Sequence, residues 1–394
     1  MWQQLKNAYH IGVAVLANWY YKSPSKNLIV IGVTGTDGKT TTVNMIYHIL
    51  KSADKKVSMI STINAVIADK AYDTGLHVSS PDPFTIQKFA SDSVNNGDEF
   101  LVLEVTSHAL DQHRFLGIDF AIGIVTNITH DHLDYHKNWD NYFITKAKLI
   151  KNVKIAILNR DELYFDRLTE QAKGKIISFG FSSKAEYNQK KFPLNLKILG
   201  DFNLLNGWAA AAACSEVGIS STIIKSALNK FSRLKGRMEE IKNNKGLMIV
   251  VDFAATPNGL EQSLKTLRKK TKGRLISVFG SAGQRDISKR FLMGKISAKF
   301  ADITIITAED PRGELNKINE QIANGAKEAG AEINKNLFII NRREKAVAFA
   351  INNISKIGDT IGFFGKGHEE SMNYDGKKEE LYSEFNQIKK SLKK

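Results

Sequence analysis

The sequence of 394 residues contains a single cysteine, Cys214, so no disulfide can form within one chain. This composition fits the reducing cytoplasm, and Cys214, which ends a run of alanines, is expected to be a small core residue. The longest apolar run near the start, residues 11–21, is much shorter than the ~20 residues that a membrane span requires. No small-residue cleavage site follows it, so no signal peptide is expected. Internal repeats and low-complexity segments are lacking too, and we expect a cytoplasmic globular protein.

A cluster of basic and aromatic residues is also lacking. The chain carries 56 Lys and Arg against 41 Asp and Glu, which gives a net charge of +15. These lysines are spread along the whole chain with acidic residues among them. We therefore do not expect nucleic acid as a partner, and interpret the charge as a field that attracts anionic small molecules. Because no apolar run is long enough to span a bilayer, we do not expect a membrane as a partner either.

Short β-branched runs alternate with helical patterns along most of the chain. Such alternation indicates an α/β fold with mostly parallel sheets covered on both faces. The length exceeds the usual size of one hydrophobic core, so two domains are expected. The predicted strands are residues 28–33, 100–105, 122–126, 155–158, 175–179, 247–253, 275–279, 303–307, 337–340 and 360–364, and predicted helices include 40–51, 257–270, 288–300 and 344–354.

A domain boundary is predicted near Gly236, where a helix-rich stretch ends before a charged surface turn. The predicted organisation is an N-terminal helix and linker over residues 1–27, a central domain over 28–234 and a C-terminal domain over 235–394.

The most informative stretch, residues 29–42, reads IVIGVTGTDGKTTT. An apolar strand ends in a glycine-rich turn that opens a helix, so backbone N–H groups and the helix N-terminus can hold phosphate oxygens. Lys39 can reach the terminal phosphates of a nucleotide, and the Thr40 hydroxyl can hold Mg²⁺. The loop is a compact variant of the P-loop, because Val33 stands where the first glycine is usual and Gly35 lies closer to the lysine. An ordinary strand–helix turn is the alternative.

Three further features add possible metal chemistry. Glu104 ends an apolar strand, where a buried carboxylate is costly unless it serves a metal or a partner. Residues 130–136, HDHLDYH, gather three histidines and two aspartates after another strand. These suit zinc or a hard metal beside phosphates, and a solvated charged loop remains the alternative. Lys146, taken alone, is expected to be a surface charge.

Together these motifs closely resemble the Mur ligases of peptidoglycan synthesis, and most of all the UDP-N-acetylmuramoyl-tripeptide synthetase (MurE) type. The resemblance covers about residues 20–390 in the order and spacing of the family. It implies a central P-loop-type ATPase domain with a mostly parallel sheet, followed by a smaller Rossmann-like α/β domain. The motifs that carry it are GTDGKTTT (35–42), EVTSHAL (104–110), NITHDHLDYH (127–136), GDFNLLN (200–206), GRME (236–239), DFAATP (252–257), RD (285–286), DPR (310–312) and GKGHE (365–369).

The resemblance implies an ATP-dependent amide ligase. An acceptor carboxylate attacks the γ-phosphate to give an acyl phosphate, and the amine of an amino acid then displaces phosphate. The lysine at the position of Lys146 is carbamylated by CO₂ in the family, which needs an unprotonated amine and creates an anionic metal ligand. Thr40 and Glu104 would hold one Mg²⁺, and Glu104, His132 and the Lys146 carbamate a second. The catalytic set is Lys39, Glu104, His132 and Lys146.

Three binding sets follow from the same matching. The positions implied for ATP are Thr34, Gly35, Thr36, Asp37, Gly38, Lys39, Thr40, Thr41, Asn203, Asn206 and Asp252. Those implied for the muramyl-peptide acceptor are Ser79, Ser80, Thr106, Gln112 and Arg114. Those implied for the incoming amino acid are Arg285, Glu309, Asp310, Pro311, Arg312, Gly365 and Glu369.

The choice of amino acid rests on a short motif. Relatives that add diaminopimelate carry Asp-Asn-Pro-Arg, whereas this chain has Glu309-Asp-Pro-Arg312. Arg312 favours a dicarboxylic amino acid, because a guanidinium grips a carboxylate with two hydrogen bonds. Asp310 adds negative charge that would tolerate lysine. We expect diaminopimelate, with L-lysine as the alternative.

Two departures from the family stand out. Full-length relatives have an N-terminal domain that binds the uridine nucleotide, and the residues before Thr34 are too few to form it. The UDP end would be left in solvent, be held by a separate protein, or be replaced by another handle on the acceptor. Ala255 stands where relatives usually have histidine, and Phe253 replaces a tyrosine. These departures keep two alternatives open: a same-fold ligase with another acceptor (folylpolyglutamate or cyanophycin type), or a catalytically silent nucleotide-binding partner.

Overall fold

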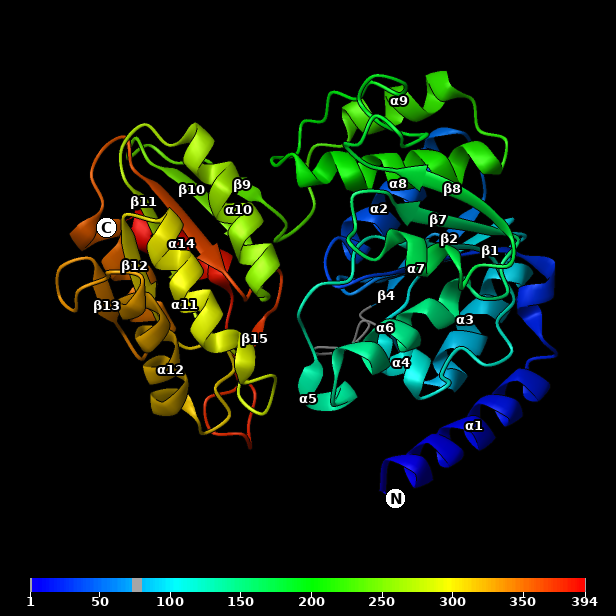
Figure 1. Cartoon of the computed structure of the whole chain (residues 1–394), viewed down its shortest axis with the longest axis horizontal. Coiled ribbons are helices and arrows are strands. Elements are labelled where there is room, and N and C mark those ends of the chain that lie inside the picture. Colours follow the sequence, from blue (N-terminus) through cyan, green and yellow to red (C-terminus); the bar gives the residue numbers. More distant parts are fainter. Residues whose placement is uncertain (1, 73–79, 394) are drawn as a thin grey trace. The chain divides into compact units, whose positions relative to one another are not determined.

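The computed structural model describes residues 2–72 and 80–393, and of residues 2–6 and 8 it describes the backbone alone. The chain divides into two compact units (Figure 1). The units are not continuous in sequence, because two short segments that lie within the first unit's range group with the second unit. The first unit is residues 1–129, 138–197 and 202–232, and the second is 130–137, 198–201 and 233–394.

The first unit is built on an eight-stranded sheet with the order β4-β3-β2-β5-β1-β6-β7-β8. The neighbouring strands β2, β5, β1, β6, β7 and β8 pair in parallel. At the other edge, β3 and β4 are antiparallel to their neighbours. The central strands are buried along nearly their whole length, as expected for a parallel sheet covered on both faces. The strand bounds are β1 Ile29–Thr34, β2 Val57–Ile60, β3 Ala65–Ile67, β4 Lys70–Tyr72, β5 Phe100–Glu104, β6 Phe120–Val125, β7 Ile155–Asn159 and β8 Lys175–Phe179.

Helices cover this sheet on both sides (Figure 1). Helices α2, α8 and α9 lie on one side, and α3, α4 and α6 lie on the other. Helix α1 packs against α3 at the margin of the unit. The helix bounds are α1 Trp2–Tyr20, α2 Lys39–Ser52, α3 Pro83–Asn95, α4 Ser107–Asp111, α6 Trp139–Ala147, α7 Phe165–Thr169, α8 Phe202–Glu216 and α9 Ser221–Lys230, with short 3₁₀ helices at Pro24–Asn27 and Lys148–Ile150.

The second unit contains a six-stranded sheet with the order β13-β12-β11-β14-β10-β9, in which only β9 is antiparallel. Branched and aromatic side chains of these strands pack with α13 and α14 into one buried core. The strand bounds are β9 Glu239–Ile241, β10 Met248–Asp252, β11 Leu275–Phe279, β12 Ile303–Ile306, β13 Leu337–Ile339 and β14 Thr360–Phe364, with a hairpin of β15 Ser371–Met372 and β16 Glu380–Leu381. The helix bounds are α5 Leu133–His136, α10 Pro257–Lys270, α11 Ser288–Phe300, α12 Leu315–Glu328, α13 Arg343–Phe349, continued by a π-helical turn Ala350–Ile354, and α14 Glu384–Leu392.

The predicted α/β class is confirmed, and every strand predicted from the sequence is present within a few residues. Strands β2, β3, β4, β9, β15 and β16 were not predicted. They are two to four residues long and most lie at sheet edges, so they lack the apolar run that marks a central strand. Over residues 2–72 and 80–393, none of the helices combines the length and hydrophobicity needed to cross a bilayer.

Candidate functional site

The glycine-rich loop joins the end of β1 to the first turn of α2 and is held in shape by the end of β6. The Thr126 hydroxyl donates to the carbonyl of Asp37 at 2.7 Å. The Asn127 Oδ1 atom accepts from the backbone N–H of Thr36 at 3.2 Å and of Asp37 at 2.9 Å. These bonds leave the loop wrapped over the N-terminus of α2, the arrangement that binds phosphate.

Two glycines permit this close approach. Gly38 caps α2 with φ 83°, a left-handed conformation that other residues adopt only with strain. A Cβ atom at Gly38 would collide with the side chain of Asn206, and one at Gly35 with the hydroxyl of Thr126. Asn206 also donates to Asn203 at 2.9 Å, so this pair lies beside the loop. Thr34 ends β1, and Thr41 is buried in the first turn of α2.

Two lysines converge on the loop from distant parts of the chain. The Nζ atom of Lys39 donates to the carbonyl of Gly35 at 3.0 Å. The Nζ atom of Lys146, from α6, donates to the same carbonyl at 2.6 Å. Lys146 is only 2% exposed and its amine lies 4.7 Å from the centre of the Tyr142 ring. The expectation of a surface lysine is therefore wrong for this residue.

A buried carboxylate faces the same helix N-terminus. Glu104, at the end of β5, is 2% exposed and accepts from the hydroxyl of Thr40 at 2.9 Å. It also accepts from the backbone N–H of Thr62 at 2.9 Å and from its hydroxyl at 2.7 Å. A hydroxyl and a carboxylate in contact at a phosphate-binding loop are the hard oxygen donors that Mg²⁺ prefers, so these residues fit that ion.

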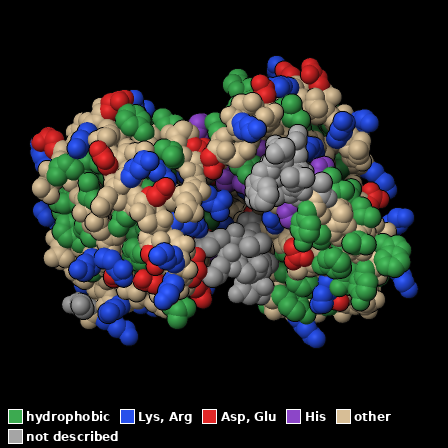
Figure 2. All heavy atoms as spheres, turned by 90° about the horizontal axis from the view of Figure 1, so that it is seen from below, with side chains coloured by type: hydrophobic (Ala, Val, Ile, Leu, Met, Phe, Trp, Pro, Cys, Tyr) green, Lys and Arg blue, Asp and Glu red, His purple; other side chains and the backbone are tan. Residues whose placement is uncertain are grey.

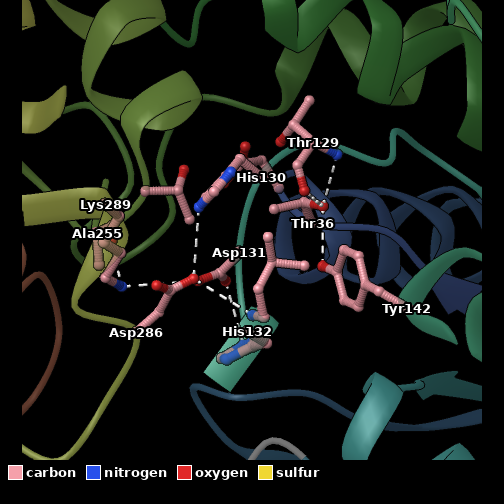
Figure 3. A network of polar contacts seen from close by, with 12 residues as sticks. Thr36, Thr129, His130, Asp131, His132, Tyr142, Ala255, Asp286 and Lys289 are labelled. Carbon is pink, nitrogen blue, oxygen red and sulfur yellow. Dashed lines mark hydrogen bonds and ion pairs between the residues drawn. The ribbon is translucent and has the colours of Figure 1, made fainter. Parts of the chain in front are cut away.

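The histidine-rich segment groups with the second unit. His132 adopts φ 54° and its Nε2 atom lies 3.1 Å from an oxygen of Asp131. The ring of His130 contacts Ser288 at 2.8 Å, and the amine of Lys289 lies 3.6 Å from Asp131 (Figure 3). His132 thus belongs to a network of charged and polar groups, while Thr40, Glu104 and Lys146 belong to the first unit.

Lys289 also donates to the backbone carbonyl of Ala255 at 2.9 Å, so the position where relatives carry histidine is in contact with a lysine. In the first unit, the hydroxyl of Thr36 contacts Tyr142 at 3.0 Å and accepts from the N–H of Thr129 at 2.9 Å (Figure 3). Within the described part of the chain, no three His, Cys, Asp or Glu side chains gather as a metal-binding group.

The residues implied for the acceptor lie together. The hydroxyl of Ser80 contacts that of Thr106 at 3.1 Å and donates to the carbonyl of Glu104. Arg114 donates to the carbonyl of Ser80 and to the side chain of Gln112, both at 2.8 Å. This polar group therefore adjoins the strand end that carries the candidate metal ligand. Ser79, predicted with this set, lies outside the described residues.

Asp252, implied for the ribose, has its oxygens engaged within its own unit. It accepts from the backbone N–H of Met238 at 3.2 Å and from the hydroxyl of Ser263 at 2.6 Å. Burial raises the pKa of this carboxyl, and these hydrogen bonds act against the increase. The contacts hold the segment before β9 against the end of β10.

The amino-acid set is organised around a lysine that the sequence analysis did not select. Lys366 is fully buried, and its amine lies 3.0 Å from Asp310 and 2.6 Å from Glu369. Asp310 also accepts from the backbone N–H of Asn373 at 2.9 Å. The negative charge of Asp310 is therefore partly offset by a buried ammonium that also pairs with Glu369. This weakens the expectation that Asp310 favours a lysine substrate.

The neighbouring residues complete this pocket. Arg312 follows Pro311 with φ 48° and donates to the carbonyl of Gly283 at 3.0 Å. Arg285 is half-buried. Glu309 is 6% exposed, its Oε2 atom has no hydrogen-bond partner among the described residues, and a Cβ atom at Gly365 would collide with its carboxylate. Burial raises the pKa of Glu309 to about 8.

Sequence reasoning missed the residues that support the site. Thr126 and Asn127 shape the loop, Thr62 holds Glu104, and Lys366 pairs with Asp310 and Glu369. Thr126 and Asn127 directly follow a predicted strand, and Lys366 lies in a glycine-rich motif. The sequence therefore carried a pattern from which these three residues could have been selected. Thr62 carried none, because its strand is short.

Comparisons with known proteins identify relatives of this chain. A family model described as "Mur ligase middle domain" matches residues 33–214, and one described as "Mur ligase, glutamate ligase domain" matches residues 236–367. The UDP-N-acetylmuramoyl-L-alanyl-D-glutamate–2,6-diaminopimelate ligase 1 of Clostridium acetobutylicum is 38% identical over 401 residues, covering 95% of this chain and 81% of the relative.

Solved structures are similar as well. A UDP-N-acetylmuramoyl-L-alanyl-D-glutamate–2,6-diaminopimelate ligase superimposes with a TM-score of 0.60 at 28% identity, covering 93% of this chain and 78% of that one. A folylpolyglutamate synthase of Mycobacterium tuberculosis reaches a TM-score of 0.69 at 13% identity, covering 89% and 91%, and shares the fold alone. On these motifs, this fold and these relatives, the chain belongs to the Mur ligase family.

Proposed function

We propose that this protein is an ATP-dependent amide ligase that adds meso-diaminopimelate to UDP-N-acetylmuramoyl-L-alanyl-D-glutamate in peptidoglycan synthesis. The observation that carries the proposal is the convergence of Lys39, Lys146, Thr40 and Glu104 on one phosphate-binding loop. The named relatives, which cover most of this chain, act on the same acceptor and amino acid.

The reaction has two balanced steps. An oxygen of the acceptor carboxylate attacks the γ-phosphorus of ATP, the bond to the β-phosphate oxygen breaks, and ADP leaves. The amine nitrogen of the amino acid then attacks the acyl carbon, the carbon–oxygen bond to phosphate breaks, and the nitrogen loses a proton. The proposal needs no covalent nucleophile from the protein, because positioning and charge neutralisation supply the rate.

The loop residues bind and orient ATP in this proposal. Backbone N–H groups of residues 35–38 and the amine of Lys39 hold the phosphates, and Asn203 and Asn206 line the base. Asp252 adjoins the ribose. Magnesium supplies charge neutralisation at the phosphates when it is bound. Thr40, Glu104, His132 and a CO₂-derived carbamate on the buried Lys146 would be its ligands.

The acceptor and the amino acid would be held by separate sets of residues. Ser79, Ser80, Thr106, Gln112 and Arg114 would hold the muramyl peptide. A separate protein could supply contacts to the uridine nucleotide, and the cytoplasm is the proposed location. The amino acid would be held by Arg285, Glu309, Asp310, Pro311, Arg312, Gly365 and Glu369.

Diaminopimelate is proposed over lysine because of two charges. The amine of Lys366 pairs with both Asp310 and Glu369 and offsets part of their negative charge, so Asp310 is less able to attract a lysine ammonium. Arg312 supplies a guanidinium that suits the distal carboxylate of diaminopimelate.

Replacing Arg312 with methionine should lower kcat/KM for diaminopimelate by about 10- to 100-fold, the usual effect of losing a hydrogen bond to a charged group. The value for lysine should fall far less, because lysine has no distal carboxylate. Steady-state kinetics with both amino acids measure the ratio, and Arg233→Met, at an exposed arginine of the same unit, is the control. An equal loss for both substrates would contradict this role.

The amino-acid site should weaken at alkaline pH because of Glu309. Below pH 8 this carboxyl is protonated and neutral, and above pH 8 it ionises and repels the substrate carboxylates. Between neutral and alkaline pH, the KM for diaminopimelate should rise in the wild type. The factor of this rise should be about five times the factor in Glu309→Gln. Parallel pH profiles of the two proteins would refute this.

The test of the function is the release of ADP and phosphate from ATP with Mg²⁺. Release should depend on both UDP-N-acetylmuramoyl-L-alanyl-D-glutamate and diaminopimelate, and mass spectrometry should find the tripeptide product. Turnover only with another carboxylate acceptor would favour a ligase of the folylpolyglutamate or cyanophycin type. No turnover despite nucleotide binding would favour the silent partner, which the departures at Phe253 and Ala255 motivate.

A further inference from the structure

Helix α1 presents a continuous apolar face to solvent. Its described residues with the largest exposure are aromatic or aliphatic, and they recur at helical spacing. Figure 2 looks at the side of the first unit on which α1 lies, and hydrophobic side chains gather there with basic and acidic side chains among and around them. The exposed fractions are 69% for Tyr9, 38% for Ile11, 52% for Val15, 59% for Leu16, 77% for Trp19 and 65% for Tyr20, and we call this set the α1 stripe.

The opposite face of the helix is anchored to the first unit. Ala14 and Ala17 are fully buried, and the side chain of Asn7 donates to Asp111 at 3.3 Å. The ring of Tyr20 lies 6.5 Å from that of Phe84, which is itself 40% exposed. The α1 stripe is therefore a fixed surface of the folded unit, and a contiguous exposed apolar patch of this kind marks an interaction site.

The segment of chain that contains the α1 stripe carries charges of one sign, while Asp111 of the neighbouring helix α4 is engaged by Asn7. Residues 1–36 contain three lysines, Lys6, Lys22 and Lys26, and no acidic residue. Lys22 and Lys26 are exposed just after the helix ends. Apolar and aromatic residues flanked by lysines are the composition of helices that lie in the interface of a membrane with anionic lipids.

We propose that the α1 stripe docks the protein on an anionic lipid surface, with the helix parallel to the membrane plane. The apolar side chains would enter the boundary between headgroups and acyl chains, and tryptophan and tyrosine are favoured at that depth. A second copy of the chain fits less well, because pairing two stripes would bring like charges together on proteins of net charge +15. This proposal revises the expectation that a membrane is not a partner, which rested on the absence of a spanning segment.

The experiment mixes the purified full chain with vesicles of phosphatidylcholine, with and without phosphatidylglycerol, and measures the bound fraction after sedimentation. The wild type should bind the anionic vesicles, and added salt should weaken this binding. The double variant Leu16→Glu, Trp19→Glu should bind at least ~10-fold less, because two apolar anchors become charged. Leu381→Glu, at a residue 99% exposed in the second unit, should bind as the wild type does.

In solution, the double variant should have the ligase rate and the circular dichroism spectrum of the wild type, because the substituted residues are exposed. These two measurements separate a loss of vesicle binding from a loss of folding. Equal binding of wild type and double variant, or of neutral and anionic vesicles, would overturn the proposal. So would a wild type that ignores vesicles but forms a dimer that the double variant cannot form, since the α1 stripe would then be a contact between copies. None of these outcomes bears on the ligase reaction.

Discussion

Lys146→Ala is expected to lower kcat/KM for ligation by about 10²–10³-fold, the cost of removing one preorganised electrostatic group from a reacting site. The lysine is buried on the phosphate-binding loop, where its amine lies 2.6 Å from the carbonyl of Gly35. As a carbamate it would supply an anionic oxygen to magnesium, which alanine cannot replace. Coupled measurement of ADP release gives the rate.

Two comparisons separate this role from a loss of folding. Lys148→Ala, at an exposed lysine two residues along the chain, should retain the wild-type rate. Short carboxylates such as acetate should partly restore the activity of Lys146→Ala, because they can occupy the space of the carbamate. A rate near that of the wild type in Lys146→Ala would refute the proposed role.

Glu104→Gln should cause a loss of similar size, about 10²–10³-fold. Glutamine keeps the shape of the side chain and can still accept from Thr40 and Thr62, so the fold of the loop should survive. It lacks the charge that binds Mg²⁺, and the concentration of Mg²⁺ needed for half-maximal activity should rise. Titration of Mg²⁺ at saturating ATP measures this shift.

The matched control is Glu99→Gln, at an exposed glutamate just before the same strand that pairs with Lys55 on the surface. Its rate and its Mg²⁺ dependence should match those of the wild type. An unchanged Mg²⁺ dependence in Glu104→Gln would remove this residue from the metal site.

Much of the first unit could be predicted from the sequence because its chemistry follows central strands. Loop 34–38 follows β1, Glu104 ends β5, and Thr126 follows β6, and in a parallel sheet the carboxyl ends of neighbouring strands meet at one edge. The order β5-β1-β6 therefore brings these segments together once the strands are recognised. Lys146 was selected through the family resemblance alone, because nothing local distinguishes it from a surface lysine.

The amino-acid pocket was harder to predict because its decisive contact is not local. Asp310 and Lys366 are 56 residues apart, and their ion pair is visible only when the segments after β12 and β14 lie side by side. From the sequence, Asp310 was an extra negative charge, and in the structure it is half of a buried pair. Burial also decides the state of Glu309, whose pKa of about 8 no sequence pattern indicates.

The exposure of the α1 stripe could not be predicted for a related reason. The sequence shows that residues 11–21 are apolar but too short to span a membrane, and such a run is usually buried in a core. Only the packing of α1 against α3 shows that the large side chains point to solvent while two alanines face the protein.

The central claim is that ATP phosphorylates the acceptor carboxylate before the amide bond forms. The most direct measurement uses acceptor labelled with ¹⁸O in the reacting carboxylate, followed by mass spectrometry of the released phosphate. If an acyl phosphate forms, the phosphate carries one labelled oxygen from the acceptor, and release requires the amino acid. Phosphate without label would mean that water attacks ATP, and it would contradict the account.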